Sequence, residues 1–225
     1  MGEAVIELFS GINLKDLVFM LKTGLPITIY LSIIAITIGT LVGFIIGWLR
    51  TIANEFFDSI ILIFVDIIRS TPLIIQLLIA YHLPAFLGIN ITTILAGSIV
   101  IVLYFAANCS QVVKAGIDSV TFNQWRAAKS LGFSYLQQMR YIILPQAWRA
   151  MIPSYTGSAL GIIKDTSLIS VIGVIELVRS GQIVISRTLN PLPIWFIIGL
   201  IYFIVCWPLS KISRHLEKKA QFGKE

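Results

Sequence analysis

The stretch "WRAAKSLGFSYLQQMRYIILPQAWR", residues 125–149, differs in composition from the sequence on both sides of it. It is basic and amphipathic, whereas most of the chain is apolar enough to enter lipid. Two residues that interrupt helices, Gly132 and Pro145, divide it. The fold must therefore place a cationic segment with two breaks between long apolar runs.

Capping signals predict two short helices in this region. Thr121 is suited to start the first helix, and Gly132 stands at the C′ position, where a left-handed backbone favours glycine. Ser134 and Gln137, three residues apart, form a capping box that predicts the start of a second helix. We expect Pro145 to end that second helix.

The first of these helices is expected to be amphipathic. Trp125, Ala128 and Leu131 recur at three-residue intervals on one face, while Arg126 and Lys129 point away from it. A helix of this kind lies either in a groove of a partner protein or in the lipid headgroup layer.

The rest of the chain predicts an all-α integral membrane protein. Of its 225 residues, 57% are hydrophobic and 12% are charged, with a mean hydropathy of +0.90, whereas soluble domains carry about a quarter charged residues. The length accommodates five spans in a single transmembrane domain, without a separate soluble domain. The expected spans are residues 23–49, 56–87 with a kink, 91–113, 150–174 and 194–210, and residues 118–148 form a segment outside the membrane between the third and fourth spans.

Basic residues in the loops indicate the orientation rather than nucleic-acid binding. With five spans, one side receives Arg50, residues 114–149 and the basic C-terminal tail. The other side receives Lys15, Lys22, Arg179 and Arg187. The positive-inside rule then predicts an N-terminus outside and a C-terminus in the cytoplasm.

Charged residues within the spans are candidates for a polar pathway, because charges in a bilayer face a cavity or a partner. Asp66 and Arg69 are three residues apart and share a helix face, which Pro72 should kink or end. They form either an ion pair at the membrane edge or a substrate contact. Lys164 and Asp165 lie near mid-membrane if their span begins at residue 150, and they pair within the protein or line the pathway.

The backbone of the spans carries two further patterns. Pro153, Gly157 and Gly161 predict that the fourth span is the least regular one. Gly39, Gly43 and Gly47 form a smooth helix face that packs either within the subunit or against another subunit. Three polar residues of the third span, together with Gln76, indicate a polar lumen, although each alone suits an interhelical hydrogen bond. They are Asn108, Ser110 and Gln111.

No nucleophile, phosphate-binding or metal-ligand motif is present in the sequence. The chain is therefore not expected to be an enzyme, to bind a metal or to hold a cofactor. Uphill transport by this chain would require an ion gradient or a second polypeptide.

The segment "RAAKSLGFSYLQQMRYIILP" resembles the EAA loop of ATP-binding cassette (ABC) importer permeases. "RSTPLIIQL" and "KDTSLISVIGVIEL" resemble motifs of the polar amino-acid branch of that family, and the resemblance covers about residues 20–215. Arg126 replaces the Glu that names the motif, and Gln111 stands where relatives often carry Glu. The residues that match the EAA register are Ala127, Ala128, Gly132, Ile142, Leu144 and Pro145.

The resemblance implies a type I ABC importer permease of a bacterial inner membrane. Its expected partners are a second permease subunit (identical or not), two ATPase subunits that bind ATP and Mg²⁺, an extracytoplasmic binding protein, an amino acid and membrane lipid. The implied coupling residues are Trp125, Arg126, Ala127, Ala128, Lys129, Gly132, Leu144 and Pro145. The candidate pathway residues are Asp66, Arg69, Gln76, Asn108, Gln111, Lys164, Asp165, Ser167 and Glu176.

The carboxylates Asp66, Asp165 and Glu176 favour a basic amino acid as the substrate. Arg69 and Lys164 could equally bind an α-carboxylate, so glutamine is the second expected substrate. The competing hypotheses are an ion-driven carrier, a membrane-embedded enzyme and a structural assembly subunit. An ion-driven carrier is expected to show inverted repeats, and five spans do not divide into two such halves.

Overall fold

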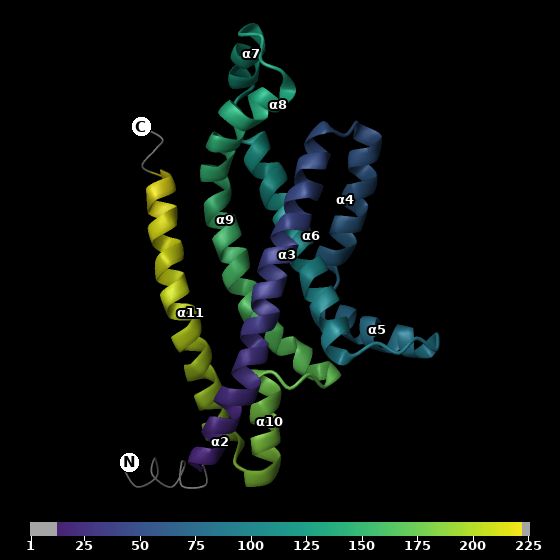
Figure 1. Cartoon of the computed structure of the whole chain (residues 1–225), viewed down its shortest axis with the longest axis vertical. Helices are drawn as coiled ribbons and strands as arrows, with labels where there is room; N and C mark the ends of the chain where they lie inside the picture. Colours follow the sequence, from purple (N-terminus) through teal and green to yellow (C-terminus); the bar gives the residue numbers. More distant parts are fainter. Residues whose placement is uncertain (1–12, 222–225) are drawn as a thin grey trace. The chain divides into compact units, whose positions relative to one another are not determined.

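The computed structural model describes residues 13–221, and over this range the backbone is helical throughout apart from short connections. The loop charges predict on which side of the membrane each chain end lies, but both chain ends are outside the described residues. The elements are α2 (Leu14–Phe19), η1 (Met20–Gly24), α3 (Leu25–Ile52), α4 (Glu55–Ser70), α5 (Leu73–Phe86), α6 (Thr93–Asp118), α7 (Phe122–Ser130), α8 (Tyr135–Gln138), η2 (Met139–Ile143), α9 (Leu144–Asp165), η3 (Thr166–Ile172), α10 (Leu177–Thr188) and α11 (Pro191–Gln221) (Figure 1).

Within residues 13–221, three helical segments are long and apolar enough to cross a membrane, namely Leu14–Ile52, Thr93–Asp118 and Pro191–Ala220. Two bent pairs raise the number of candidate spans to five. The first pair is α4 with α5, bent by 100°, and the second is Tyr135–Ile172 with α10, bent by 49°. The 39 residues of the first segment measure about 58 Å at 1.5 Å per residue, which exceeds the ~30 Å hydrocarbon layer.

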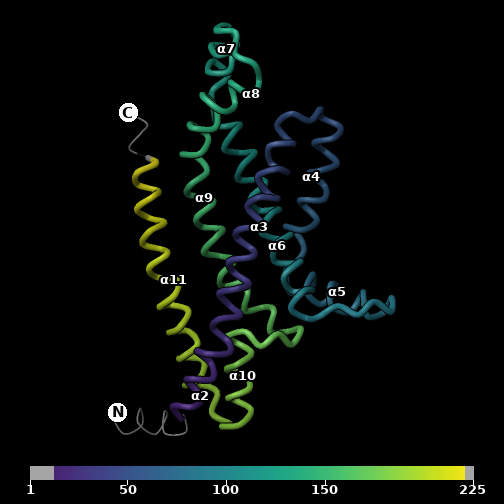
Figure 2. The backbone as a smooth tube through the Cα atoms, viewed as in Figure 1, coloured from purple at the N-terminus to yellow at the C-terminus, as the bar shows by residue number. Residues whose placement is uncertain are grey.

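The described chain divides into two compact units. The first unit comprises residues 13–35, 71–102 and 160–209, and the second comprises residues 36–70, 103–159 and 210–221. The smooth backbone trace in Figure 2 follows α3, α6, α9 and α11, each of which contributes residues to both units. The basic residues expected on one side of the membrane fall in the second unit, and those expected on the other side fall in the first.

The core of the first unit forms where α10 packs against η1 and α11. Its buried residues are Met20, Leu177, Val184, Ile194 and Ile198. Asp16 is also buried, and Arg187 pairs with it at 2.6 Å between Nη2 and Oδ1. Residues 177–188 follow the expected fourth span, which ends at residue 174, so α10 is an addition to the expected fold.

In the second unit, α3 and α6 approach each other closely at two glycines. A Cβ atom on Gly43 would lie 2.6 Å from the carbonyl oxygen of Ala106, and one on Gly47 would lie 2.6 Å from that of Ser110. This part of the glycine face therefore packs within the subunit, which is the first of the two alternatives for it.

The prolines of the spans behave differently from one another. α4 ends at Ser70 and α5 begins at Leu73, so the break expected at Pro72 is confirmed. Pro145 instead lies in the first turn of α9 and ends no helix, so that prediction is wrong. The π-helical turn η2 directly precedes α9, and its wider i→i+5 pattern accommodates a residue that lacks an N–H.

The irregular backbone of the fourth span also lies elsewhere than expected. α9 continues through Pro153, Gly157 and Gly161 to Asp165. The proline removes one hydrogen bond, which does not break a long helix. Irregularity begins instead with the 3₁₀ helix η3 and the left-handed Gly173, whose φ is 88°.

Candidate functional site

The short helix α7 ends in the turn that its sequence predicts. Gly132 has a φ of 78°, which confirms the expected left-handed backbone. The Gly132 N–H donates to the Lys129 carbonyl at 3.0 Å, and the Phe133 N–H donates to the Ala128 carbonyl at 3.2 Å. These two bonds form a Schellman motif, which fixes the direction in which the chain leaves α7.

The second helix starts at the predicted capping box. The Ser134 N–H donates to Gln137 Oε1 at 2.8 Å, and α8 follows at once. From Tyr135 the chain stays helical through η2 and α9 to Ile172. The segment at residues 118–148, for which the resemblance implies a coupling role, therefore joins the fourth span without a loop.

The apolar face of α7 packs against α8 and η2 of its own unit. Ala128 is fully buried, and the ring of Trp125 stacks on that of Tyr135 with centroids 6.1 Å apart. Leu131, which was expected on the same face, is 72% exposed. Most of the face that would enter a partner's groove or a membrane is thus already occupied.

The opposite face of α7 consists of Phe122, Arg126 and Lys129, which we call the cationic face. These residues are spaced i, i+4 and i+7, so they share one side of the helix. All three are exposed, and the Arg126 guanidinium carbon lies 4.5 Å from the centre of the Phe122 ring. Residues 119–164 contain no Asp or Glu, so no carboxylate of this segment neutralises the face.

The second unit brings together three of the candidate pathway residues. Arg69 and Asp66 on α4 form the expected pair, with 3.7 Å between Nη1 and Oδ1. The Arg69 Nε also donates to Asn108 Oδ1 on α6 at 3.3 Å. Both charged side chains are about half exposed, so this polar group is accessible from outside the unit.

A fourth candidate, Gln111, belongs to a separate cluster around Arg50. The Arg50 side chain is only 5% exposed. Its Nε lies 2.7 Å from Asp58 Oδ1, and its Nη1 donates to Gln111 Oε1 at 3.1 Å. Arg50 was expected only as a basic loop residue, although Asp58, a carboxylate eight residues later in an apolar run, is a signal for such a pair.

The first unit holds the remaining candidates. Gln76 on α5 donates from Nε2 to the Thr71 carbonyl at 2.9 Å. Lys164 and Asp165 are the last two residues of α9, and Ser167 follows in η3, against which α5 packs. The polar residues of α5 and η3 thus belong to two elements in contact.

Glu176 is fully buried at the start of α10. Its two carboxylate oxygens accept from the N–H groups of Arg179 at 2.7 Å and Val178 at 2.9 Å, so it is the N-cap of that helix. The Tyr202 hydroxyl lies 3.4 Å from the same carboxylate, and the neighbouring Leu177 N–H donates to Thr28 Oγ1 at 3.1 Å. These contacts give Glu176 a clear structural role.

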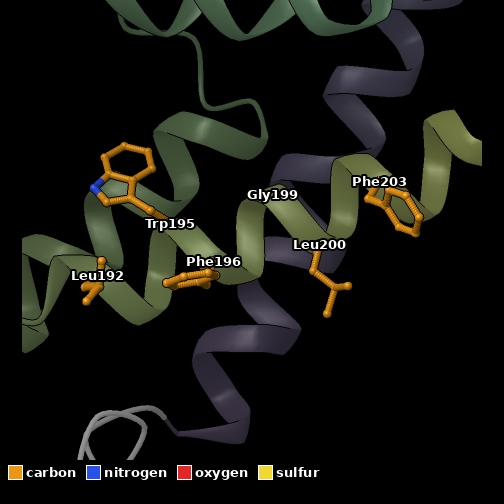
Figure 3. Close-up of a pocket in the computed structure, with 6 residues that line it drawn as sticks. All are labelled: Leu192, Trp195, Phe196, Gly199, Leu200 and Phe203. Atoms are coloured by element: carbon orange, nitrogen blue, oxygen red, sulfur yellow. The ribbon is translucent and has the colours of Figure 1, made fainter. Parts of the chain in front are cut away.

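An apolar groove runs along one side of α11, and the large side chains that line it project from the helix (Figure 3). The lining residues are Leu192, Trp195, Phe196, Gly199, Leu200 and Phe203. Leu192, Phe196, Leu200 and Phe203 are each more than half exposed. A face of this composition suits the hydrocarbon of a bilayer. Within residues 13–221, no three His, Cys, Asp or Glu side chains converge as metal ligands would.

Comparison with known proteins gives consistent matches. The family model described as "Binding-protein-dependent transport system inner membrane component" matches residues 35–221. The glutamine transport system permease protein GlnP of Escherichia coli (strain K12) is 33% identical over 202 residues, which cover 89% of this chain and 92% of that protein.

A second relative is the arginine transport system permease protein ArtQ of Bacillus subtilis (strain 168). It is 30% identical over 208 residues, covering 92% of this chain and 94% of that protein. Among solved structures, the crystal structure of an amino acid ABC transporter with histidines superposes with a TM-score of 0.84. It is 31% identical, over 91% of this chain and 95% of that one.

Proposed function

The chain belongs to the family of binding-protein-dependent transport system inner membrane components, and from that premise we propose how it works. It is the multi-pass permease subunit of an ATP-driven importer of polar amino acids, with the all-helical permease fold that its sequence predicts. Within that role, we assign α7 to ATPase docking and the polar residues of the spans to the translocation pathway.

The observation that carries the docking assignment is the arrangement of α7. Its apolar face is held by its own unit, and its turn is fixed by Gly132. The cationic face is therefore presented as a preformed surface. Two ATPase subunits, each holding ATP and Mg²⁺, would supply the energy, while this chain contributes the surface that receives their movement.

Movement at this surface has a direct route along the chain. The backbone is helical without interruption from Tyr135 to Ile172, so a displacement of α8 and η2 is passed on to α9. Lys164 and Asp165 end α9. We propose that this helix couples ATP binding by the partner to access of the pathway.

The remaining partners follow from the same proposal. A second permease subunit would complete the pathway, and an extracytoplasmic binding protein would deliver the substrate. We propose that the unit with α7 faces the cytoplasm. It carries Arg50, the basic residues of the segment 114–149 and those of the C-terminal end of α11, and loops rich in Lys and Arg lie on the cytoplasmic side.

We propose basic amino acids as the first substrate class and glutamine as the second. Asp66 and Asp165 provide carboxylates for a cationic side chain, and Arg69 and Lys164 provide partners for an α-carboxylate. Glu176 supports this choice less than expected, because both of its oxygens already cap α10. The relatives named for glutamine and for arginine transport leave both substrate classes open.

Reconstitution tests the function. The chain, its ATPase and its binding protein are placed in proteoliposomes, and uptake of labelled arginine, histidine, glutamine and glutamate is followed. We expect ATP-dependent uptake of arginine or histidine that glutamate does not compete for. Uptake driven by an ion gradient without the ATPase would contradict the proposal.

Two substitutions test the role of α7. Ala128→Glu places a charge at a fully buried position, and Gly132→Pro requires a φ near −65° where the turn has 78°. We expect both to abolish uptake while membrane insertion survives. Ala115→Glu, the same change at an exposed position of α6, should leave transport nearly unchanged. Normal uptake in both test variants would disprove the docking assignment.

A further inference from the structure

The chemistry of the surface that docks on α7 follows from the cationic face. We propose that the partner ATPase presents an acidic surface to α7, with one carboxylate bound by Arg126. This inference rests on the proposed function and adds the charge of the partner to it.

The first support is the charge of the segment. Arg126, Lys129, Arg140 and Arg149 are its only ionisable groups other than tyrosine between residues 119 and 163, and none of them is acidic. The ion pairs between described side chains include neither Arg126 nor Lys129. A partner that covers this face must supply the negative charge, because like charges in contact oppose association.

The second support is the geometry of Arg126. Its guanidinium lies over the exposed Phe122 ring at 4.5 Å, in a cation–π contact that holds the group on the face of α7. The N–H groups of a guanidinium lie in its plane and point outward along its edge. That edge matches a carboxylate with two parallel hydrogen bonds.

The third support separates a protein partner from a lipid surface. A helix that lies on a membrane needs a continuous apolar face. In α7, Trp125 and Ala128 pack inside the unit. The exposed large apolar residues Phe122 and Leu131 are nine positions apart, which places them on opposite sides of a helix at about 100° per residue. The exposed surface of α7 therefore has no apolar stripe for lipid.

The identity of residue 126 adds a consequence for specificity. The family's motif carries Glu at this position, so a partner built to receive a Glu would meet an Arg of opposite charge here. We infer that an ATPase subunit taken from a system with the usual Glu assembles poorly with this chain, and that the native partner carries the complementary charge.

Assembly of the intact complex tests this inference. The full chain is co-expressed with its ATPase and binding protein and inserted into nanodiscs, and the affinity of the ATPase is measured at 50 and 500 mM salt. We expect Arg126→Glu to weaken binding at least tenfold at low salt and Arg126→Lys to weaken it about threefold. The loss should shrink at high salt, because salt screens the repulsion.

Arg140→Glu is the matched control. Arg140 is also an exposed cation over an aromatic ring, 5.7 Å from the centre of Tyr141, but it belongs to η2. Its substitution makes the same change in net charge and should weaken binding less than twofold. Equal losses in the two variants would overturn the assignment to Arg126. A charge-reversing Asp→Lys or Glu→Lys change on the ATPase should restore binding to Arg126→Glu.

Three outcomes would count against the proposals in distinguishable ways. Failure of the wild-type chain to bind the ATPase at either salt concentration would contradict the proposed function itself. Equal binding by wild type and Arg126→Glu would refute the acidic partner alone. A loss seen in nanodiscs of anionic phosphatidylglycerol but not of phosphatidylcholine would make the cationic face a lipid contact and would also refute it.

Discussion

Two ion pairs of nearly equal length in the second unit should contribute very differently to stability. Arg50 Nε lies 2.7 Å from Asp58 Oδ1, and the two side chains are 5% and 29% exposed. Lys114 Nζ lies 2.6 Å from Asp118 Oδ2, with exposures of 22% and 54%. Loss of a partner from a buried pair costs about 3–5 kcal/mol, because a buried charge is left uncompensated. Loss of an exposed pair costs about 0–1 kcal/mol.

We therefore expect Asp58→Asn to lower the free energy of unfolding by about 3 kcal/mol, at the low end of that range because Asp58 is partly exposed. Asp118→Asn should lower it by no more than ~0.5 kcal/mol. Reversible unfolding of the purified chain in mixed micelles, followed by circular dichroism, measures both values.

A rescue variant makes the reasoning specific to Arg50. Gln111 Oε1 accepts from Arg50 Nη1 at 3.1 Å, so Gln111→Glu places a new carboxylate at the same guanidinium. It should recover about half of the stability lost in Asp58→Asn. Equal losses in the two single variants, or no recovery in the double variant, would show that burial of Arg50 does not determine the energy.

Two further changes test contacts of the second unit. Gly43→Ala places a Cβ 2.6 Å from the Ala106 carbonyl oxygen, while Gly157→Ala meets no atom within 4 Å. Both gain the same helix propensity, so the first should be about 1–3 kcal/mol less stable than the second in the same unfolding assay, and equal stability would contradict the close approach of α3 and α6. Glu217 accepts from the hydroxyls of Ser213 at 2.7 Å and Thr156 at 3.1 Å. Glu217→Ala should therefore reduce amide protection by about 2 kcal/mol in residues 210–221, while Glu217→Gln should retain most of it, as measured by hydrogen exchange.

The sequence predicted the long helices well because their signal is local and repeated. Charge-free apolar runs located the starts of α6 and α11 to within a few residues and the end of α3 likewise, but the first helix extends back to Leu14 and α11 continues eleven residues beyond the expected end at residue 210. Gly132 and the capping box at Ser134 were also predicted correctly. Each depends only on residues within one or two helical turns.

The features that sequence analysis missed depend on residues far apart in the chain. Arg50 and Gln111 are separated by 61 positions, and Leu177 and Thr28 by 149. No periodicity within one helix indicates such contacts. Glu176 was expected in the pathway because its carboxylate could pair with a cationic side chain; the structure adds that both of its oxygens cap α10, and a pathway role stays a prediction.

The two prolines show that even a local signal does not always predict where a helix ends. Pro72 lies in the break after α4, but Pro145 lies in the first turn of α9, directly after a π-helical turn. The residue is the same and the neighbouring turn decides the outcome, because a wider turn removes the need for the missing N–H. A rule based on residue type alone cannot distinguish the two cases.

The π-helical turn η2 also makes the coupling segment sensitive to chain length. Each residue of a helix turns the chain by about 100°, and η2 lies between α7, which we propose as the ATPase-docking helix, and the long helix α9. Deleting one residue within Met139–Ile143 would rotate α7 by about that angle about the axis of α9, with no side chain of α7 changed. Insertions and deletions at this turn would thus redirect docking more severely than most substitutions, so the length of this turn should be conserved more strictly than its sequence.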